Sequence, residues 1–212
     1  MTAESYPTRR RIGLWLGLGA LAMACALAEW WNAARKLEAL TNSPAPDRPV
    51  RDAPNIKTPA DIVERMVALA EIGPDDLVCD LGCGDGRLVI AAVARHGCNG
   101  LGLDNDPERL VEARAAAEGA GVADRIEFVE ANILEHDFSA ADAVLMYLLP
   151  KLNEALVPQL NNLKPGARIV SSEFEIKGLK AESIERIRSA ANGEEYVLFL
   201  YRRPQPIGER GR

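Results

Sequence analysis

Short apolar runs alternate with helix-like patterns along most of the chain after residue 57. Apolar runs bounded by turn residues are typical of buried strands, and apolar positions three and four apart are typical of helices. The pattern predicts strands at residues 77–80, 99–104, 125–133, 143–150 with its exit, 167–172, 183–188 and 195–202. It predicts helices at residues 58–70, 87–96, 107–120 and 151–163. This alternation predicts an α/β domain with a doubly wound, mostly parallel sheet, and Asn192-Gly193 predicts a final antiparallel hairpin.

A glycine-rich turn joins the first predicted strand to the next helix. Ligands of doubly wound domains bind at such turns, outside the carboxyl ends of the strands. Asp80 ends the strand, and Arg87 stands where a dinucleotide-binding loop has its third glycine, so both residues disfavour a pyrophosphate. A carboxylate suits a cationic group such as the amino group of a methionine moiety, which favours S-adenosylmethionine (SAM). The loop residues predicted to contact the cofactor are Gly82, Cys83, Gly84 and Gly86.

The next two strands also end in polar residues. Asp104 lies about 20 residues after the loop, the spacing expected of a carboxylate that binds ribose hydroxyls, in NAD as well as SAM. Asn132 ends the third strand, and its amide oxygen can accept from the amino group of adenine. We include the following residues, Asn105 and Ile133, in the predicted site. Thr58 and Pro59 predict a helix start with Thr58 as N-cap, and the segment Ile56–Thr58 is a candidate lid over the cofactor.

These three elements, in this order, resemble the class I, or seven-strand, SAM-dependent methyltransferases from about Thr58 to Arg203. The resemblance implies a Rossmann-like seven-stranded sheet and SAM as the methyl donor. Asp80 and the alternating glycines match the family's first motif, and Asp104 matches its ribose acid. A glycine-rich turn that serves only α/β packing is one competing interpretation. An NAD-dependent oxidoreductase is another, which Arg87 and the position of Asp80 disfavour.

The methyl acceptor is expected beside the fourth strand, where methyl transfer needs alignment and desolvation. Tyr147 at that exit and Glu173 after the fifth strand are the candidate catalytic residues. Residues 147–150 and 163–174 resemble bacterial relatives of the membrane-anchored mitochondrial protein-lysine methyltransferases. This resemblance implies a lysine acceptor. A small-molecule, lipid or quinone methyltransferase and a non-catalytic SAM-binding module remain alternatives.

Composition narrows these alternatives only slightly. The chain has 212 residues, 48% hydrophobic and 26% charged, with a formal net charge of -6 that is spread along the sequence. Dispersed charge of this sign argues against a nucleic-acid partner. The histidines, His96 and His136, are expected at the surface, and no spacing predicts a metal site or a disulfide framework. We therefore expect the four cysteines to be small, buried and reduced.

An uncharged apolar run from Ile12 to Ala28 follows three arginines and precedes Trp30-Trp31. The run predicts a membrane anchor, and Ala26-Leu27-Ala28 leaves a cleaved signal peptide as the alternative. Because SAM is kept in the cytosol, we expect the catalytic domain to face the cytoplasm; export is the alternative. The pattern predicts no oligomeric state. The predicted organisation is a basic segment (1–11), an anchor (12–31), a proline-rich tether (32–57), the methyltransferase domain (58–203) and a tail (204–212).

Overall fold

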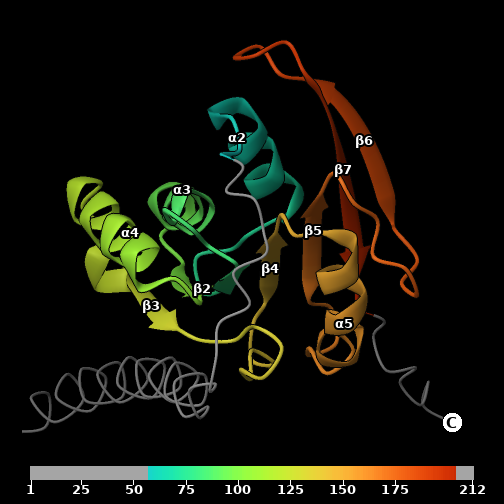
Figure 1. The fold of residues 1–212 in the computed structure, drawn as a ribbon, viewed down its shortest axis with the longest axis horizontal. Helices are drawn as coiled ribbons and strands as arrows, with labels where there is room; N and C mark the ends of the chain where they lie inside the picture. The colour runs from blue at the N-terminus through green and yellow to red at the C-terminus, as the bar shows by residue number, and fades with distance from the viewer. Residues whose placement is uncertain (1–56, 204–212) are drawn as a thin grey trace, which may run out of the picture. The chain divides into compact units, whose positions relative to one another are not determined.

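The computed structural model describes residues 57–203, which form one seven-stranded sheet in the order β3-β2-β1-β4-β5-β7-β6 (Figure 1). Strands β1 to β5 are parallel, and β7 runs antiparallel to both β5 and β6. The strands are β1 (Leu77–Leu81), β2 (Asn99–Asp104), β3 (Ile126–Glu130), β4 (Ala143–Met146), β5 (Arg168–Ser172), β6 (Ser183–Arg188) and β7 (Glu195–Arg202). The mostly parallel sheet and the C-terminal hairpin are both confirmed.

Three helices pack side by side against one face of the sheet (Figure 1). They are α2 (Ala60–Leu69), α3 (Arg87–His96) and α4 (Pro107–Gly119); α5 (Pro150–Leu160) lies apart from them, and a 3-10 turn, η1 (Ala123–Arg125), precedes β3. The core joins α2 and α3 to the sheet through Val78, Leu145 and Val170. Every residue of β1 is buried, as is usual for a central strand of a parallel sheet, which explains its apolar run without alternation.

Several predicted boundaries differ from the observed ones, and β1 continues one residue past Asp80, to Leu81. Two further differences bear on the candidate site. The third strand ends at Glu130 rather than at residue 133, because the Asn132 side chain accepts from the Leu134 N–H at 3.0 Å and turns the chain. Helix α2 begins at Ala60, and no side chain caps it, so Thr58 is not its N-cap. The Thr58 carbonyl oxygen accepts from Arg87 instead.

The fourth predicted helix is also shifted. It spans Pro150–Leu160 instead of residues 151–163. Proline suits the first helical position because an N–H group there would have no acceptor within the helix, so its absence costs no hydrogen bond. The helix continues through Pro158, which removes one backbone hydrogen bond, and ends two residues later.

The cysteine prediction is confirmed for the described part of the chain, where Cys79, Cys83 and Cys98 are buried and free. The histidine prediction is wrong for His136, which is only 2% exposed. Neither of its ring nitrogens has a hydrogen-bond partner among the described residues, and burial lowers its pKa although Asp137 opposes this. Within residues 57–203, no three acidic, histidine or cysteine side chains are grouped to hold a metal ion.

The predicted N-terminal segments and anchor lie outside the described residues, as does the tail. Between residues 57 and 203, no helix has the length and hydropathy needed to cross a membrane.

Gly86 supports the turn between β1 and α3. It has φ +75°, and a Cβ there would lie 2.9 Å from a ring carbon of Phe128. We expect Gly86→Ala to lower the free energy of unfolding by about 3 kcal/mol, through backbone strain and overpacking. Gly121→Ala is the control, because Gly121 has φ +71° with open space around it. If urea denaturation shows the same decrease in the free energy of unfolding for Gly86→Ala and Gly121→Ala, the contact with Phe128 contributes nothing.

Candidate active site

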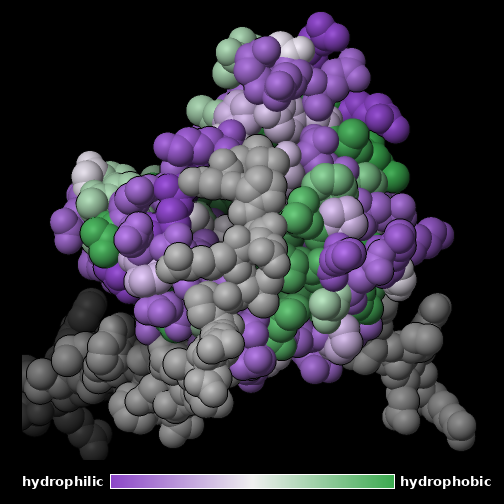
Figure 2. All heavy atoms as spheres, in the orientation of Figure 1, coloured by the Kyte–Doolittle hydropathy of each residue, from purple (hydrophilic) through white to green (hydrophobic). Residues whose placement is uncertain are grey.

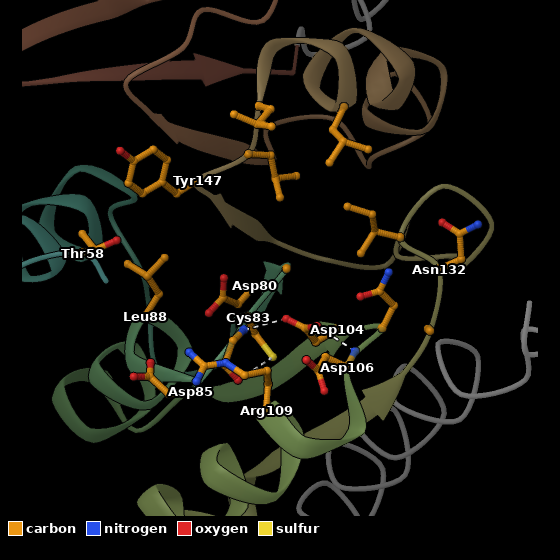
Figure 3. Close-up of a pocket in the computed structure, with 18 of the residues that line it drawn as sticks. Thr58, Asp80, Cys83, Asp85, Leu88, Asp104, Asp106, Arg109, Asn132 and Tyr147 are labelled. Carbon is orange, nitrogen blue, oxygen red and sulfur yellow. Dashed lines mark hydrogen bonds between the residues drawn. The ribbon is translucent and has the colours of Figure 1, made fainter. Parts of the chain in front are cut away.

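A cavity of about 930 Å³ opens at the carboxyl ends of β1, β2 and β4 (Figure 3). Ten of the twelve predicted site residues line this cavity: Thr58, Asp80, Gly82, Cys83, Gly84, Asp104, Asn105, Asn132, Ile133 and Tyr147. Gly86 and Glu173 do not line it. Segments distant in the sequence meet here because the carboxyl ends of parallel strands lie at one edge of the sheet.

Asp80 is a buried acidic residue whose hydrogen-bonding capacity is not fully used by the described residues. It is 1% exposed, and its Oδ2 atom has no hydrogen-bond partner among the described residues. The pKa of Asp80 is raised to about 8, chiefly by burial; a backbone hydrogen bond from Val89 opposes the shift, and the charges of Asp104 and Asp85 add to it. A buried carboxylate oxygen without a partner is unfavourable, so a cationic ligand group suits this position.

Asp104 shapes the glycine loop as well as lining the cavity. Its Oδ2 atom accepts from the Gly84 N–H at 2.8 Å, and its Oδ1 atom accepts from the Asp106 N–H at 2.9 Å. The Leu103 carbonyl oxygen accepts from the N–H groups of Gly82 and Cys83 at 2.8 and 2.9 Å. The end of β2 thus holds the loop in place, and the carboxylate keeps lone pairs that can accept from a ligand's hydroxyl groups.

Gly84 leaves the floor of the cavity open. It has φ +54°, and a Cβ there would meet only the side chain of Arg109, at 3.8 Å. At Gly82, by contrast, a Cβ would lie 2.9 Å from Leu148. A ligand can therefore approach the backbone most closely at Gly84, where a side chain would take its place.

Asn132 lies at the far end of the cavity from Thr58 and Tyr147 (Figure 3). Its amide oxygen accepts from Leu134, and its amide nitrogen donates to Glu135 at 2.9 Å. These bonds fix the side chain, and the oxygen has a second lone pair for a ligand. Ile133 adds an apolar surface to the same wall.

Tyr147 and Glu173 follow neighbouring strands. Met146 pairs with Ser171 across β4 and β5, so both residues come just after the paired ends. Burial raises the pKa of Tyr147 to about 12, and the charges of Glu173 and Glu194 and the phenol of Tyr196 contribute. The hydroxyl group is therefore neutral at physiological pH.

Glu173 is strained and bonded to β7. Its φ is +67°, a conformation that residues other than glycine adopt rarely and mostly at functional sites. Its Oε1 atom accepts from the Val197 N–H at 3.0 Å. Glu173 thus lies close enough to Tyr147 for its charge to act on that phenol, but it does not line the cavity.

Sequence reasoning missed a group of lining residues. Asp85 and Arg87 line the cavity, and so do Leu148, Leu149 and Pro150, which the sequence placed at the exit of the fourth strand without assigning them a contact. A strip of hydrophobic side chains also lies on the face of the molecule beside α5 (Figure 2). The sequence signal for Arg87 is its position in the glycine motif, where its charge as well as its bulk bears on the site.

Comparison with known proteins agrees with this geometry. The family described as the ANTKMT methyltransferase domain matches residues 80–183. A "Protein-lysine N-methyltransferase" of Saccharolobus islandicus (strain REY15A) is 39% identical over 154 residues, which cover 72% of this chain and 94% of that protein. The chain belongs to the same methyltransferase family as this relative.

Solved structures of methyltransferases have the same fold as this chain. The crystal structure described as an RNA methyltransferase from Salinibacter ruber, in complex with S-adenosyl-L-homocysteine (SAH), is 36% identical. It covers 73% of this chain and 97% of its own, with a TM-score of 0.66. A geranyl diphosphate methyltransferase in complex with SAM has a TM-score of 0.57 at 16% identity, which supports the fold alone.

The chain is therefore a SAM-dependent methyltransferase, and SAM is its cofactor. The predictions of fold core, enzyme class and cofactor are confirmed. The residues of this chain also fit SAM. One oxygen of Asp80 lacks a hydrogen-bond partner among the described residues, and Gly84 leaves the floor of the cavity open. The expectation of no nucleic-acid partner stays a prediction, since a similar solved structure is described as an RNA methyltransferase.

Proposed function

We propose that this methyltransferase transfers a methyl group from SAM to the ε-amino group of a lysine in a protein. The observation that carries the proposal is the 39% identity to a protein-lysine N-methyltransferase over nearly that protein's whole length. The negative charge beside Tyr147 supports it, because the carboxylates of Glu173 and Glu194 lie near this residue. Carboxylates attract a lysine ammonium and raise its local concentration.

In this proposal each part of SAM has a partner in the chain. The Asp80 carboxylate receives the amino group of the methionine moiety, and the Asp104 carboxylate receives the ribose hydroxyls. Asn132 and Ile133 hold the adenine, while Thr58, Cys83 and Asn105 complete the walls. In Figure 3 Asp80 lies between Tyr147 and Asp104, so the methionine end of such a ligand lies nearer the acceptor side than its ribose does.

SAM, when bound, supplies an electrophilic methyl group on a positively charged sulfur. The lone pair of the lysine nitrogen forms the new N–C bond while the C–S bond breaks, and the sulfur keeps that electron pair. The attacking amine must be neutral, so the lysine loses a proton to solvent before attack. Tyr147 accepts a hydrogen bond from the amine and orients it, and the apolar residues Leu148 and Leu149 exclude water.

Substitution of Tyr147 tests the acceptor side. We expect Tyr147→Phe to lower kcat about 10-fold and Tyr147→Ala about 100-fold, because the hydroxyl orients the amine and the ring forms the wall. The Kd for SAH, measured by calorimetry, should change less than about 3-fold in both variants, since no cofactor contact is proposed for Tyr147. Wild-type turnover in both variants would remove Tyr147 from the site.

The acceptor itself is identified by labelling. The purified protein is incubated with radiolabelled SAM and an extract from cells that lack the gene, and the label is then followed through protease, RNase and lipid extraction. We expect label in protein, recovered as methyllysine after hydrolysis. Label in RNA would favour the activity that the Salinibacter structure's description names. Label in extractable lipid or a small molecule would favour the second alternative, and both outcomes would contradict the lysine proposal.

We further propose that the predicted anchor at residues 12–31 keeps the enzyme at a membrane with its domain facing the cytoplasm. The apolar run after three arginines supports this placement. A C-terminal fusion to a reporter active only in the cytoplasm should be active and should sediment with membranes. Activity of a periplasmic reporter, or a soluble and shortened protein, would instead support export after signal cleavage.

A further inference from the structure

The guanidinium group of Arg87 joins two segments that line the cavity. Its Nε and Nη2 atoms donate to the two carboxylate oxygens of Asp85, at 2.9 and 2.5 Å. Its Nη1 atom donates to the Thr58 carbonyl oxygen at 2.6 Å. Asp85 belongs to the glycine loop and Thr58 precedes α2, and both line the cavity (Figure 3). The Arg87 side chain therefore connects two parts of the cavity lining.

These contacts are of the strong kind. A guanidinium that binds both oxygens of a carboxylate has a fixed orientation, and such bonds are stronger than neutral ones. The pair is partly shielded, with side-chain exposures of 32% for Arg87 and 21% for Asp85. Thr58 is 4% exposed, so the carbonyl that Arg87 holds belongs to a buried residue. Helix α2 has no side-chain cap, which leaves Arg87 as the side chain that fixes the chain just before it.

The other end of the same short segment is fixed to the acceptor side. Asp61, in the first turn of α2, accepts from the Ser189 hydroxyl at 2.9 Å and from the Ala190 N–H at 2.7 Å. Both residues lie in the loop between β6 and β7, which also carries Glu194. Residues 58–61 therefore run from the glycine loop to the hairpin loop, and both ends are held by side chains.

We propose that Arg87 is a positioning residue for the methyltransferase. It holds the Thr58 backbone in place as a wall of the cavity, at a fixed distance from the glycine loop. Arg87 does not act on the reacting atoms. It sets the width of the cavity between Asp85 and Thr58, and so the fit of SAM. The inference rests on the proposed placement of SAM in this cavity.

The test compares two arginines of α3. Arg87→Ala removes the connection, whereas Arg87→Lys keeps the charge but loses the two-pronged contact. Arg95→Ala is the matched control, because Arg95 also bonds from α3 to α2, through Glu64, but at an exposed position outside the cavity. The Kd for SAH, the KM for SAM and kcat are measured for each variant, together with Tm.

We expect Arg87→Ala to raise the Kd for SAH and the KM for SAM about 10-fold, and Arg87→Lys about 3-fold, with kcat at saturating SAM changed less. Arg95→Ala should leave both constants at the wild-type value even if its Tm falls. If Arg87→Ala does not fold, the 3-fold effect of Arg87→Lys relative to Arg95→Ala decides. The inference is overturned if both Arg87 variants show the wild-type Kd and KM. If Arg87→Ala is unfolded, wild-type constants in Arg87→Lys alone overturn it.

Asp104→Ala separates this inference from the placement of SAM. If it weakens SAH binding while the Arg87 variants do not, SAM binds here and the role of Arg87 is wrong. If Asp104→Ala also binds SAH with wild-type affinity, the proposed placement of SAM fails with it.

Discussion

Asp80→Asn is expected to weaken SAH binding about 100-fold or more while the protein stays folded. The carboxylate is proposed to bind the amino group of SAM or SAH at a buried site, and a neutral amide leaves that ammonium without a counter-charge. Asparagine has nearly the same shape, so the packing around β1 is kept. Calorimetric titration with SAH measures the affinity. An affinity within about 3-fold of wild type would remove Asp80 from the cofactor site.

Asp80→Asn is expected to raise the stability of the protein at alkaline pH. A loss of SAH affinity in this variant would therefore not come from unfolding. Because burial raises the pKa of Asp80 to about 8 from a usual value of 3.8, the folded protein holds this proton more tightly than the unfolded chain does. The contribution of Asp80 to stability is therefore full below about pH 4 and is lost as the pH rises through about 8. Asp80→Asn carries no such loss, so at pH 8.5 it should unfold at a higher urea concentration than the ligand-free wild type.

Proton release on binding provides a second readout of Asp80. At pH 7 a carboxyl group with a pKa of about 8 is mostly protonated, and an ammonium partner favours its charged form. SAH binding should therefore release close to one proton at pH 7, seen as a dependence of the binding enthalpy on the ionisation enthalpy of the buffer. Asp80→Asn should abolish the release. Wild-type binding without proton release at pH 7 would contradict the proposed role of Asp80.

Gly84→Val is the second substitution with a large expected effect. Its side chain would project into open space above the loop, where SAM is proposed to lie. We expect SAH binding to be lost in calorimetry, because the side chain occupies the ligand's position. The cost to folding is limited to the strain of a branched side chain at φ +54°, about 1–3 kcal/mol.

Gly97→Val is the matched control for that strain. Gly97 follows α3 with φ +67°, and a Cβ at this position would meet nothing within 4 Å. The variant should lose a similar free energy of unfolding and bind SAH as the wild type does. If Gly97→Val loses binding equally, the effect of Gly84→Val comes from general destabilisation, and the open floor at Gly84 is not the cofactor site.

The strand pattern was predictable because burial acts on local sequence. Strand β1 is an unbroken apolar run up to its acid, and the bounds of β2, β6 and β7 agree with the pattern. The strand order was supplied by family resemblance, since apolar runs do not specify their neighbours. The ends were less certain: Asn132 turns the chain through its own side chain, and Pro158 is tolerated inside α5.

The candidate site was predictable where it lies at strand ends. Asp80 and Asp104 line one cavity because parallel strands bring their carboxyl ends together. Long-range contacts were not predictable in this way. That Arg87 reaches Thr58, and that Glu173 bonds Val197 and does not line the cavity, depends on how separate elements pack.

The most direct test of the account is a crystal structure of the protein in complex with SAH. We expect the amino group of SAH beside the Asp80 carboxylate, its ribose hydroxyls on Asp104, and its sulfur toward Tyr147. SAH bound outside this cavity, or bound within it with neither carboxylate in contact, would contradict the central claim that these two strand ends hold the methyl donor.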